Sequence, residues 1–103
     1  MNMPNNNYRN GAAYERRIAT KLKQKGYYVM RSSGSHGIFD LIAIDFNSGH
    51  IMFIQLKNYA IGKKEFQRIS EEIKALAPQP SAEVSFYALE HTGRGTDRMT
   101  LIR

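Results

Sequence analysis

The sequence contains no cysteine, so it can form neither disulfide bonds nor thiolate metal sites. It also lacks any apolar run close to the roughly 20 residues that a membrane-spanning helix needs. Its polar, Asn-rich start has no apolar segment of the kind found in a secretory signal. We therefore expect a protein of the cytoplasm with no membrane partner.

Acidic side chains are scarce, and the first third of the chain has the fewest. The whole chain holds 15 Lys and Arg against 9 Asp and Glu, which gives a formal net charge of +6. Residues 1–31 contain seven basic side chains and a single acid, Glu15. This uneven distribution favours a polyanionic partner over charge that serves solubility alone.

The length of 103 residues allows one domain with one modest core. We expect residues 1–8 to form a flexible tail and residues 9–103 to form the domain. Hydrophobic periodicity predicts an α/β fold, a mixed β-sheet flanked by helices in the order αβββαββ. The predicted helices are Gly11–Lys25 and Glu65–Ala77, and the predicted strands are Tyr27–Arg31, Asp40–Phe46, Ile51–Lys57, Val84–Leu89 and Met99–Ile102.

Two details of this pattern are open to test. Residues 41–44 are apolar at every position, so both faces of that strand should be covered. The polar residues 91–98 should form a flexible loop, because they contain two glycines and several short polar side chains. The second helix carries an apolar stripe that forms either core or a dimer seam. The stripe is made of Phe66, Ile69, Ile73 and Leu76.

Polar side chains interrupt this apolar pattern at three places. Glu15 falls in the middle of the first helix's apolar stripe, where a carboxylate is costly unless it caps a backbone group, pairs with an arginine or meets a ligand. Asp40 opens an apolar strand directly after a Gly- and Ser-rich loop. Gln55 and Lys57 end the next strand, and their spacing of two directs both to one face.

A four-residue turn would bring these features together. If Phe46 faces Ile51, then Asp40 faces Lys57 and shares one face of the sheet with Gln55. A five-residue turn would place Asp40 on the other face, unless a bulge restored the alignment. Glu15 would join the group if the first helix packs on that same face.

Such a cluster suits hydrolysis of a phosphodiester. Mg²⁺ prefers oxygen ligands, usually one or two carboxylates with waters and phosphate oxygens. Asp40, Glu15 and the amide oxygen of Gln55 are the candidate ligands. Lys57 could orient the attacking water or stabilise the charge that develops on phosphate.

Five segments with these residues match one known family in order and spacing. They are Arg9–Arg16, Val29–Ser35, Asp40–Ala43, Ile54–Lys57, and Ile61–Lys64 with Arg68–Ile69. With them the chain resembles the archaeal-type Holliday junction resolvases of the PD-(D/E)XK nuclease superfamily, which have a restriction-endonuclease-like fold. The resemblance covers nearly the whole chain from Arg9.

This resemblance implies a homodimer that binds branched DNA and makes paired nicks in four-way junctions with Mg²⁺, which Mn²⁺ can replace. It implies catalytic roles for Glu15, Asp40, Lys57 and a loop serine, best matched by Ser35, with Ser32 and Ser33 as alternatives near the DNA. The residues expected to contact DNA are Arg9, Arg16, Arg31, Ser32, Ser33, His36, Lys63, Lys64 and Arg68. For Lys63 and Lys64 a solvated charged turn remains the alternative.

Gln55 departs from the family, which usually carries Glu-x-Lys where this chain has Gln-x-Lys. The change removes one negative charge from the metal site. Because Mrr-type restriction endonucleases resemble this chain in having Gln at that position, we expect an active enzyme. The alternatives are a restriction- or repair-type nuclease on other DNA forms, a DNA-binding module with a decayed site, and a basic structural protein without a site. No nucleotide cofactor is expected, because residues 62–64 lack the rest of a P-loop.

Overall fold

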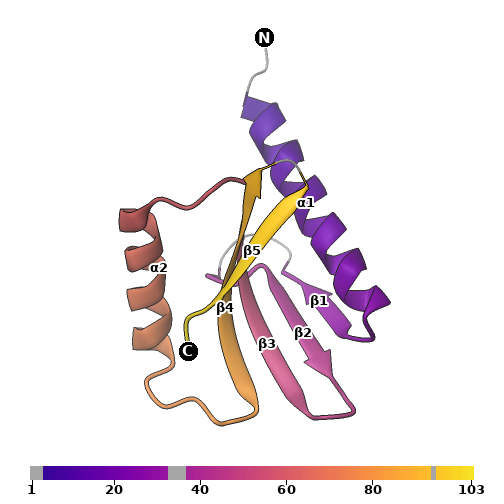
Figure 1. Cartoon of the computed structure of the whole chain (residues 1–103), viewed down its shortest axis with the longest axis vertical. Coiled ribbons are helices and arrows are strands. Elements are labelled where there is room, and N and C mark those ends of the chain that lie inside the picture. Colours follow the sequence, from indigo (N-terminus) through magenta and orange to yellow (C-terminus); the bar gives the residue numbers. More distant parts are fainter. Residues whose placement is uncertain (1–3, 33–36, 94) are drawn as a thin grey trace.

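The structure, a computed structural model, describes residues 4–32, 37–93 and 95–103, with side chains described from Gly11 onward. It contains two helices and five strands in the expected order (Figure 1). They are α1 (Pro4–Gln24), β1 (Tyr28–Arg31), β2 (Leu41–Asp45), β3 (His50–Lys57), α2 (Lys63–Leu76), β4 (Val84–Gly93) and β5 (Thr96–Leu101). Neither helix is long and apolar enough to cross a membrane.

The five strands form one sheet in the order β1-β2-β3-β4-β5. Strands β3 and β4 are parallel, and the other neighbouring pairs are antiparallel. A parallel pair needs a long crossover connection, and α2 provides it. The predicted α/β fold with a mixed sheet is therefore confirmed.

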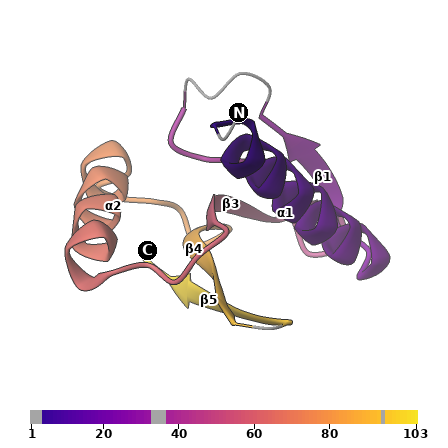
Figure 2. The same cartoon turned by 90° about the horizontal axis from the view of Figure 1, so that it is seen from above.

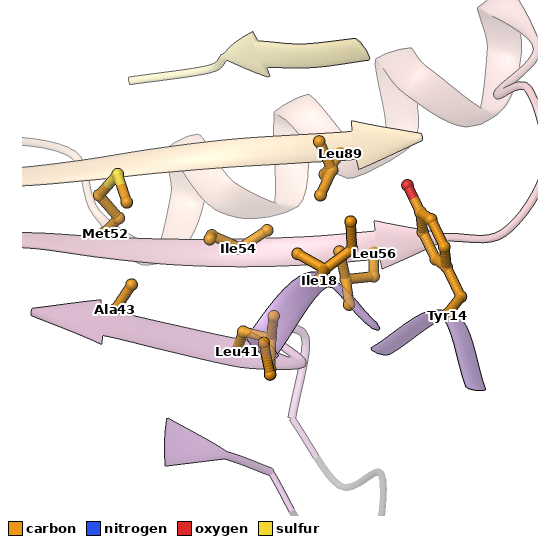
Figure 3. Packing of buried hydrophobic residues seen from close by; sticks show 9 residues of the cluster. Tyr14, Ile18, Leu41, Ala43, Met52, Ile54, Leu56 and Leu89 are labelled. Atoms are coloured by element: carbon orange, nitrogen blue, oxygen red, sulfur yellow. The ribbon is translucent and has the colours of Figure 1, made fainter. Parts of the chain in front are cut away.

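The two helices cover opposite faces of this sheet (Figure 2). On one face, apolar residues of α1 pack against alternate residues of β2, β3 and β4 (Figure 3). On the other face, Ile69 and Ile73 of α2 pack against Phe53 and Phe86. Alternation along each strand therefore decides which helix a side chain meets.

The largest differences from the sequence-based boundaries are at the start of α1 and in the segment 91–98. Helix α1 begins at Pro4 and not at Gly11, so residues from Pro4 onward that were expected in a loose tail are helical. Proline is well suited to the first turn of a helix, where its missing N–H has no partner to lose. The polar segment 91–98, expected as a flexible loop, lies largely in β4 and β5 because its side chains bond across the hairpin and to α1.

The pairing of β2 with β3 is displaced by two residues from the predicted register. Asp45 faces His50 and Ile42 faces Phe53, whereas we expected Phe46 to face Ile51 and Ile42 to face Gln55. The turn is still four residues long, but it begins one residue earlier. A displacement of two keeps every side chain on its predicted face, so Asp40 and Gln55 still share one side of the sheet.

The α2 side of β2 is less covered than its apolar sequence suggested. Leu41 and Ala43 are fully buried under α1, but Ile42 and Ile44 on the other face are only partly buried. The expectation that both faces would be covered is therefore wrong for this side, because the apolar cluster under α2 includes residues of β3 and β4 but none of β1 or β2. This leaves an apolar strip along one edge of the sheet.

Candidate active site

Asp40 is fixed where β2 begins beside β3. Its backbone N–H donates to the carbonyl of Ile54 at 2.8 Å, and its carboxylate Oδ2 accepts from the backbone N–H of Leu56 at 2.7 Å. These bonds continue the strand pairing by one residue and hold the carboxylate against β3. The position directly before β2 therefore gives Asp40 a defined orientation, although a carboxylate there could have been an ordinary loop residue.

The carboxylate of Asp40 is in an electrostatically unfavourable place. Burial raises its pKa above the usual range, and the nearby charge of Glu15 raises it further. The hydrogen bond from Leu56 and the charge of Lys57 lower the pKa but do not cancel the effect of burial. A cation at this position would therefore be stabilised strongly by Asp40 and would favour its ionised form.

Gln55 provides a second oxygen on the same face. Its side-chain Oε1 is buried, and it has no hydrogen-bond partner among the described residues. A buried amide oxygen without a partner costs free energy unless a donor or a cation meets it. Gln55 and Lys57 both line an open pocket of about 330 Å³ between β3 and α2. The donor set therefore fits a hard cation that prefers oxygen ligands.

Glu15 lies at the edge of this group. The prediction that it falls in the centre of the α1 stripe is wrong. The buried α1 residues are Tyr14, Ile18 and Ala19, whereas the Glu15 side chain is 20% exposed. Its Oε1 accepts from Nε of Arg31 at 2.8 Å. Helix α1 also packs on the face of the sheet opposite to Asp40, so Glu15 reaches toward the site around the sheet edge.

These positions leave a small acidic set. Within the described ranges, no three His, Cys, Asp or Glu side chains are grouped closely enough to hold a metal by themselves. Asp40 and Gln55 share a face, and Glu15 acts on Asp40 through its charge. A bound cation would accordingly take part of its coordination from water or phosphate oxygens.

Lys57 points into the same region and is held by α2. Its Nζ lies 3.5 Å from Oε2 of Glu65 and 5.9 Å from the centre of the Tyr59 ring. Sequence analysis missed Glu65, because an acid in the first turn of a helix is explained well enough by the helix dipole. Only the folded arrangement brings this carboxylate to the lysine.

Glu90 is a second acid that sequence analysis missed. It is 2% exposed and faces Lys57 in the parallel register of β3 and β4. Its carboxylate accepts from the N–H of Ile61 at 2.7 Å and from Nε of Arg98 at 3.1 Å. Burial acts to raise its pKa, but these two hydrogen bonds outweigh burial and lower it. The sequence did contain a signal for Glu90, because this acidic residue ends the apolar run of β4.

The predicted DNA-contacting residues divide into three groups. Arg16, Ser32, Lys63 and Lys64 are exposed, and Arg31 and Arg68 are exposed but paired with acids. Ser33, Ser35 and His36 lie outside the described residues. Arg9 belongs to the part of α1 whose side chains are not described. The structure thus offers no geometry for Ser35, the predicted catalytic serine.

The apolar stripe of α2 is core and not a dimer seam. Ile69 and Ile73 are buried at 2% and 0% exposure. Only Leu76, at the end of the helix, is strongly exposed, at 64%. The stripe therefore serves the fold, and any seam between two copies must use another surface.

One protein family matches more than half of the chain. Residues 6–78 match the family model described as archaeal Holliday junction resolvase (Hjc), a range that includes Glu15, Asp40, Gln55 and Lys57. No curated protein matches the sequence.

Two solved structures are similar in fold. Hjc of Archaeoglobus fulgidus, a Holliday junction resolvase from an archaeal hyperthermophile, matches with a TM-score of 0.63 and 17% identity, covering 89% of this chain and 77% of that one. A repair endonuclease from Pyrococcus abyssi matches with a TM-score of 0.51 and 17% identity, covering 82% of this chain and 38% of that one. At these identities the likeness establishes the fold.

Proposed function

The chain belongs to the archaeal Holliday junction resolvase family, and we propose that it resolves four-way DNA junctions by metal-dependent hydrolysis at the site of Asp40, Gln55 and Lys57. One observation carries this assignment to these residues. A buried amide oxygen of Gln55 has no partner among the described residues, on the same sheet face as a carboxylate whose charge burial disfavours. Both groups would gain from one divalent cation.

Asp40 would be the main ligand, with Gln55 giving a neutral oxygen and Glu15 acting directly or through water. When bound, Mg²⁺, or Mn²⁺ in its place, would supply Lewis-acid activation of water and would stabilise charge on the phosphate. Asp40 is held ready for this role by the N–H of Leu56, which leaves the other carboxylate oxygen available for coordination. Glu15 is held by Arg31 at the edge of the site.

Lys57 would act on the reacting phosphate. Its ammonium can donate hydrogen bonds to a phosphate oxygen or orient the attacking water, and its positive charge opposes the negative charge that develops in the transition state. The exposed basic residues Arg16, Lys63 and Lys64 would contact the DNA backbone, so affinity should fall steeply as salt is raised. We place this activity in the cytoplasm, where recombining DNA is available to the enzyme.

Paired nicks require two sites at a fixed separation, so we propose a homodimer. The uncovered α2-side edge of the sheet is the best surface for it. The rings of Tyr28 and Phe46 contact each other there at a tilted angle, with ring centres 5.7 Å apart, and the two residues are 54% and 75% exposed. Met30, also exposed, continues this strip toward a pocket that Asp40 lines. We call Tyr28, Met30 and Phe46 the edge strip.

The test is cleavage of a synthetic four-way junction by the wild-type protein and by Asp40→Ala. We expect the wild type to make paired nicks with Mg²⁺ or Mn²⁺, and Asp40→Ala to bind the junction without nicking it. The separate linear arms, offered at the same concentration, should be cut far more slowly. Equal cutting of the junction and of the linear arms would assign the site to a nuclease of other specificity. Cleavage by the Asp40→Ala variant would show that Asp40 does not belong to the catalytic site.

A further inference from the structure

Three donors of different chemistry converge on one carboxylate oxygen beside the candidate active site. Oε2 of Glu65 accepts from the phenol O–H of Tyr59 at 2.8 Å. The same oxygen lies 3.5 Å from Nζ of Lys57 and 3.8 Å from Nη2 of Arg68. One hydroxyl, one ammonium and one guanidinium thus surround a single negatively charged atom.

We propose that Lys57, Tyr59 and Arg68 form a binding site for a backbone phosphate of DNA, which the carboxylate of Glu65 fills in the free protein. The inference rests on the proposed function, because the ligand is the phosphate of a DNA substrate. These donors are those that proteins use for phosphate oxygens, and a carboxylate offers the same kind of acceptor.

Shielding from water does not explain why the charged groups of Lys57, Glu65 and Arg68 lie together. The side chains of Lys57 and Glu65 are each 25% exposed, and that of Arg68 is 62% exposed, so water could hydrate all three charges. Exposed ion pairs contribute little to stability. A carboxylate held this way can leave at small cost when a stronger anion arrives.

The location also favours a phosphate of the substrate. Lys57 belongs both to this group and to the pocket that Gln55 lines, and Arg68 lines the same pocket from α2. A DNA strand placed over Asp40 and Gln55 would bring negative charge against Glu65. Entry of a phosphate would therefore repel the carboxylate of Glu65 and free Lys57 and Tyr59 from it, while Arg68 would keep its bond to Glu72.

Glu65→Gln tests the proposal, with Glu71→Gln as a matched control. Glu71 lies on the same helix and carries the same charge, but its side chain is exposed and accepts from Gln67 at 3.4 Å, outside the group around Glu65. Binding of a fluorescent four-way junction is followed by anisotropy in EDTA, where no cleavage occurs, at several salt concentrations. Far-UV circular dichroism checks that each variant is folded.

We expect Glu65→Gln to bind the junction about twofold to fivefold more tightly, the effect of removing one competing charge at a partly exposed site. The slope of log affinity against log salt should steepen by about one, because one more phosphate is neutralised without displacing a carboxylate. Glu71→Gln should change neither the slope nor the affinity at moderate salt. Identical behaviour of the two variants would overturn the proposal.

A double-mutant cycle gives an independent readout. In the wild type, Tyr59→Phe removes a hydrogen bond both from the free protein and from the complex, so affinity should hardly change. In Glu65→Ala, the Tyr59 hydroxyl has only the phosphate as partner, and Tyr59→Phe should weaken binding about twofold to fivefold. Equal effects in both backgrounds would contradict competition for the same donors.

Nicking separates this inference from the proposed function. If the wild type does not nick junctions but Glu65→Gln binds them more tightly, the proposed function is overturned and the phosphate site is retained. Normal nicking with no gain in affinity would overturn the site alone. Slower nicking by Glu65→Gln at saturating DNA, without tighter binding, would instead make Glu65 a positioning residue for Lys57 and would also overturn the site.

Discussion

Asp40 and Gln55 illustrate how single residues at this site oppose stability. Asp40 keeps a partly buried carboxylate near the carboxylate of Glu15, and Gln55 keeps a buried oxygen without a partner in the described part of the chain. Both arrangements cost free energy in the metal-free protein. Such costs are expected where a ligand, and not the fold, satisfies the groups.

Asp40→Asn should raise the free energy of unfolding by about 1 kcal/mol at neutral pH without metal, because it removes a disfavoured buried charge. The amide oxygen of the new side chain can still accept from the backbone N–H of Leu56. The pKa of Asp40 is raised above its ordinary value of 3.8, so the native state binds the proton more readily than the unfolded state. Wild-type stability therefore falls as pH rises from 3.8 through the raised pKa.

Urea denaturation of both proteins across this pH range measures the effect. The advantage of Asp40→Asn should be largest at neutral pH and should vanish below 3.8, where the wild-type carboxyl is neutral in both states. Added Mg²⁺ should stabilise the wild type and leave the variant unchanged. A variant less stable than the wild type at neutral pH would show that the carboxylate supports the fold.

Gln55→Glu restores the family's usual acid and should have opposite effects with and without metal. Without metal it should lower the free energy of unfolding by about 1–3 kcal/mol, because a second charge enters a buried position beside Asp40. With metal it should lower the Mg²⁺ concentration for half-maximal nicking by about tenfold, since a charged ligand replaces a neutral one. Magnesium titration of nicking, with thermal unfolding in EDTA, measures both. An unchanged magnesium requirement would mean that this side chain is not a ligand.

At the level of elements, the β4–β5 hairpin is attached to α1 through one carboxylate. Asp97 of β5 accepts from the hydroxyl of Tyr14 at 2.9 Å and from Nη1 of Arg17 at 3.4 Å. Nδ1 of His91 lies 3.1 Å from the same carboxylate, and Nζ of Lys21 lies 3.7 Å from it. These bonds connect two elements that are distant in sequence, and they explain why a polar segment forms strands.

Asp97→Asn should lower the free energy of unfolding by about 1–2 kcal/mol, because four cationic or polar partners lose a charged acceptor and the Asp97 side chain is only 12% exposed. Burial acts to raise the pKa of Asp97, but the hydrogen bonds from His91, Tyr14 and Arg17 outweigh it and lower the pKa. This stability is present above the ordinary value of 3.8 and is lost as pH falls through the lowered pKa.

Denaturant unfolding of the wild type, Asp97→Asn and the surface control Glu71→Gln measures this contribution. The wild type and Asp97→Asn should converge in strong acid, whereas Glu71→Gln should follow the wild type throughout. A constant difference between wild type and Asp97→Asn at every pH would assign the loss to packing and not to charge.

At the level of the whole molecule, the sheet has one well-covered face and one partly covered face. The edge strip lies on the partly covered face, beside the pocket that Asp40 lines. A second copy seated there would cover apolar surface and would fix the separation of two sites. The other exposed edge, at β5, carries Met99 at 42% exposure and lies farther along the sheet.

Phe46→Glu should raise the dimer dissociation constant by at least about tenfold, because a charge would be buried in the seam. Analytical ultracentrifugation measures the constant, and Met99→Glu serves as the control at the opposite edge. The Phe46→Glu protein should also release singly nicked junctions where the wild type releases paired products. A dimer broken by Met99→Glu but not by Phe46→Glu would move the seam to β5.

The sequence alone predicted the element order and the grouping of Asp40, Gln55 and Lys57 on one sheet face. It did so because hydrophobic periodicity is local and because a strand alternates with a period of two. The register was wrong by two residues, yet the grouping survived, since only an odd displacement changes faces. Gln55 could likewise be singled out as a polar residue ending an apolar strand.

The folded structure was needed for every feature that depends on contacts between distant segments. It brought α1 to the opposite face and so placed Glu15 at the edge of the site with Arg31. It turned a polar loop into strands through Asp97, and it brought Glu65 to Lys57. No local pattern encodes these contacts, because each depends on how two separately formed elements pack and on which polar groups that packing leaves to be satisfied.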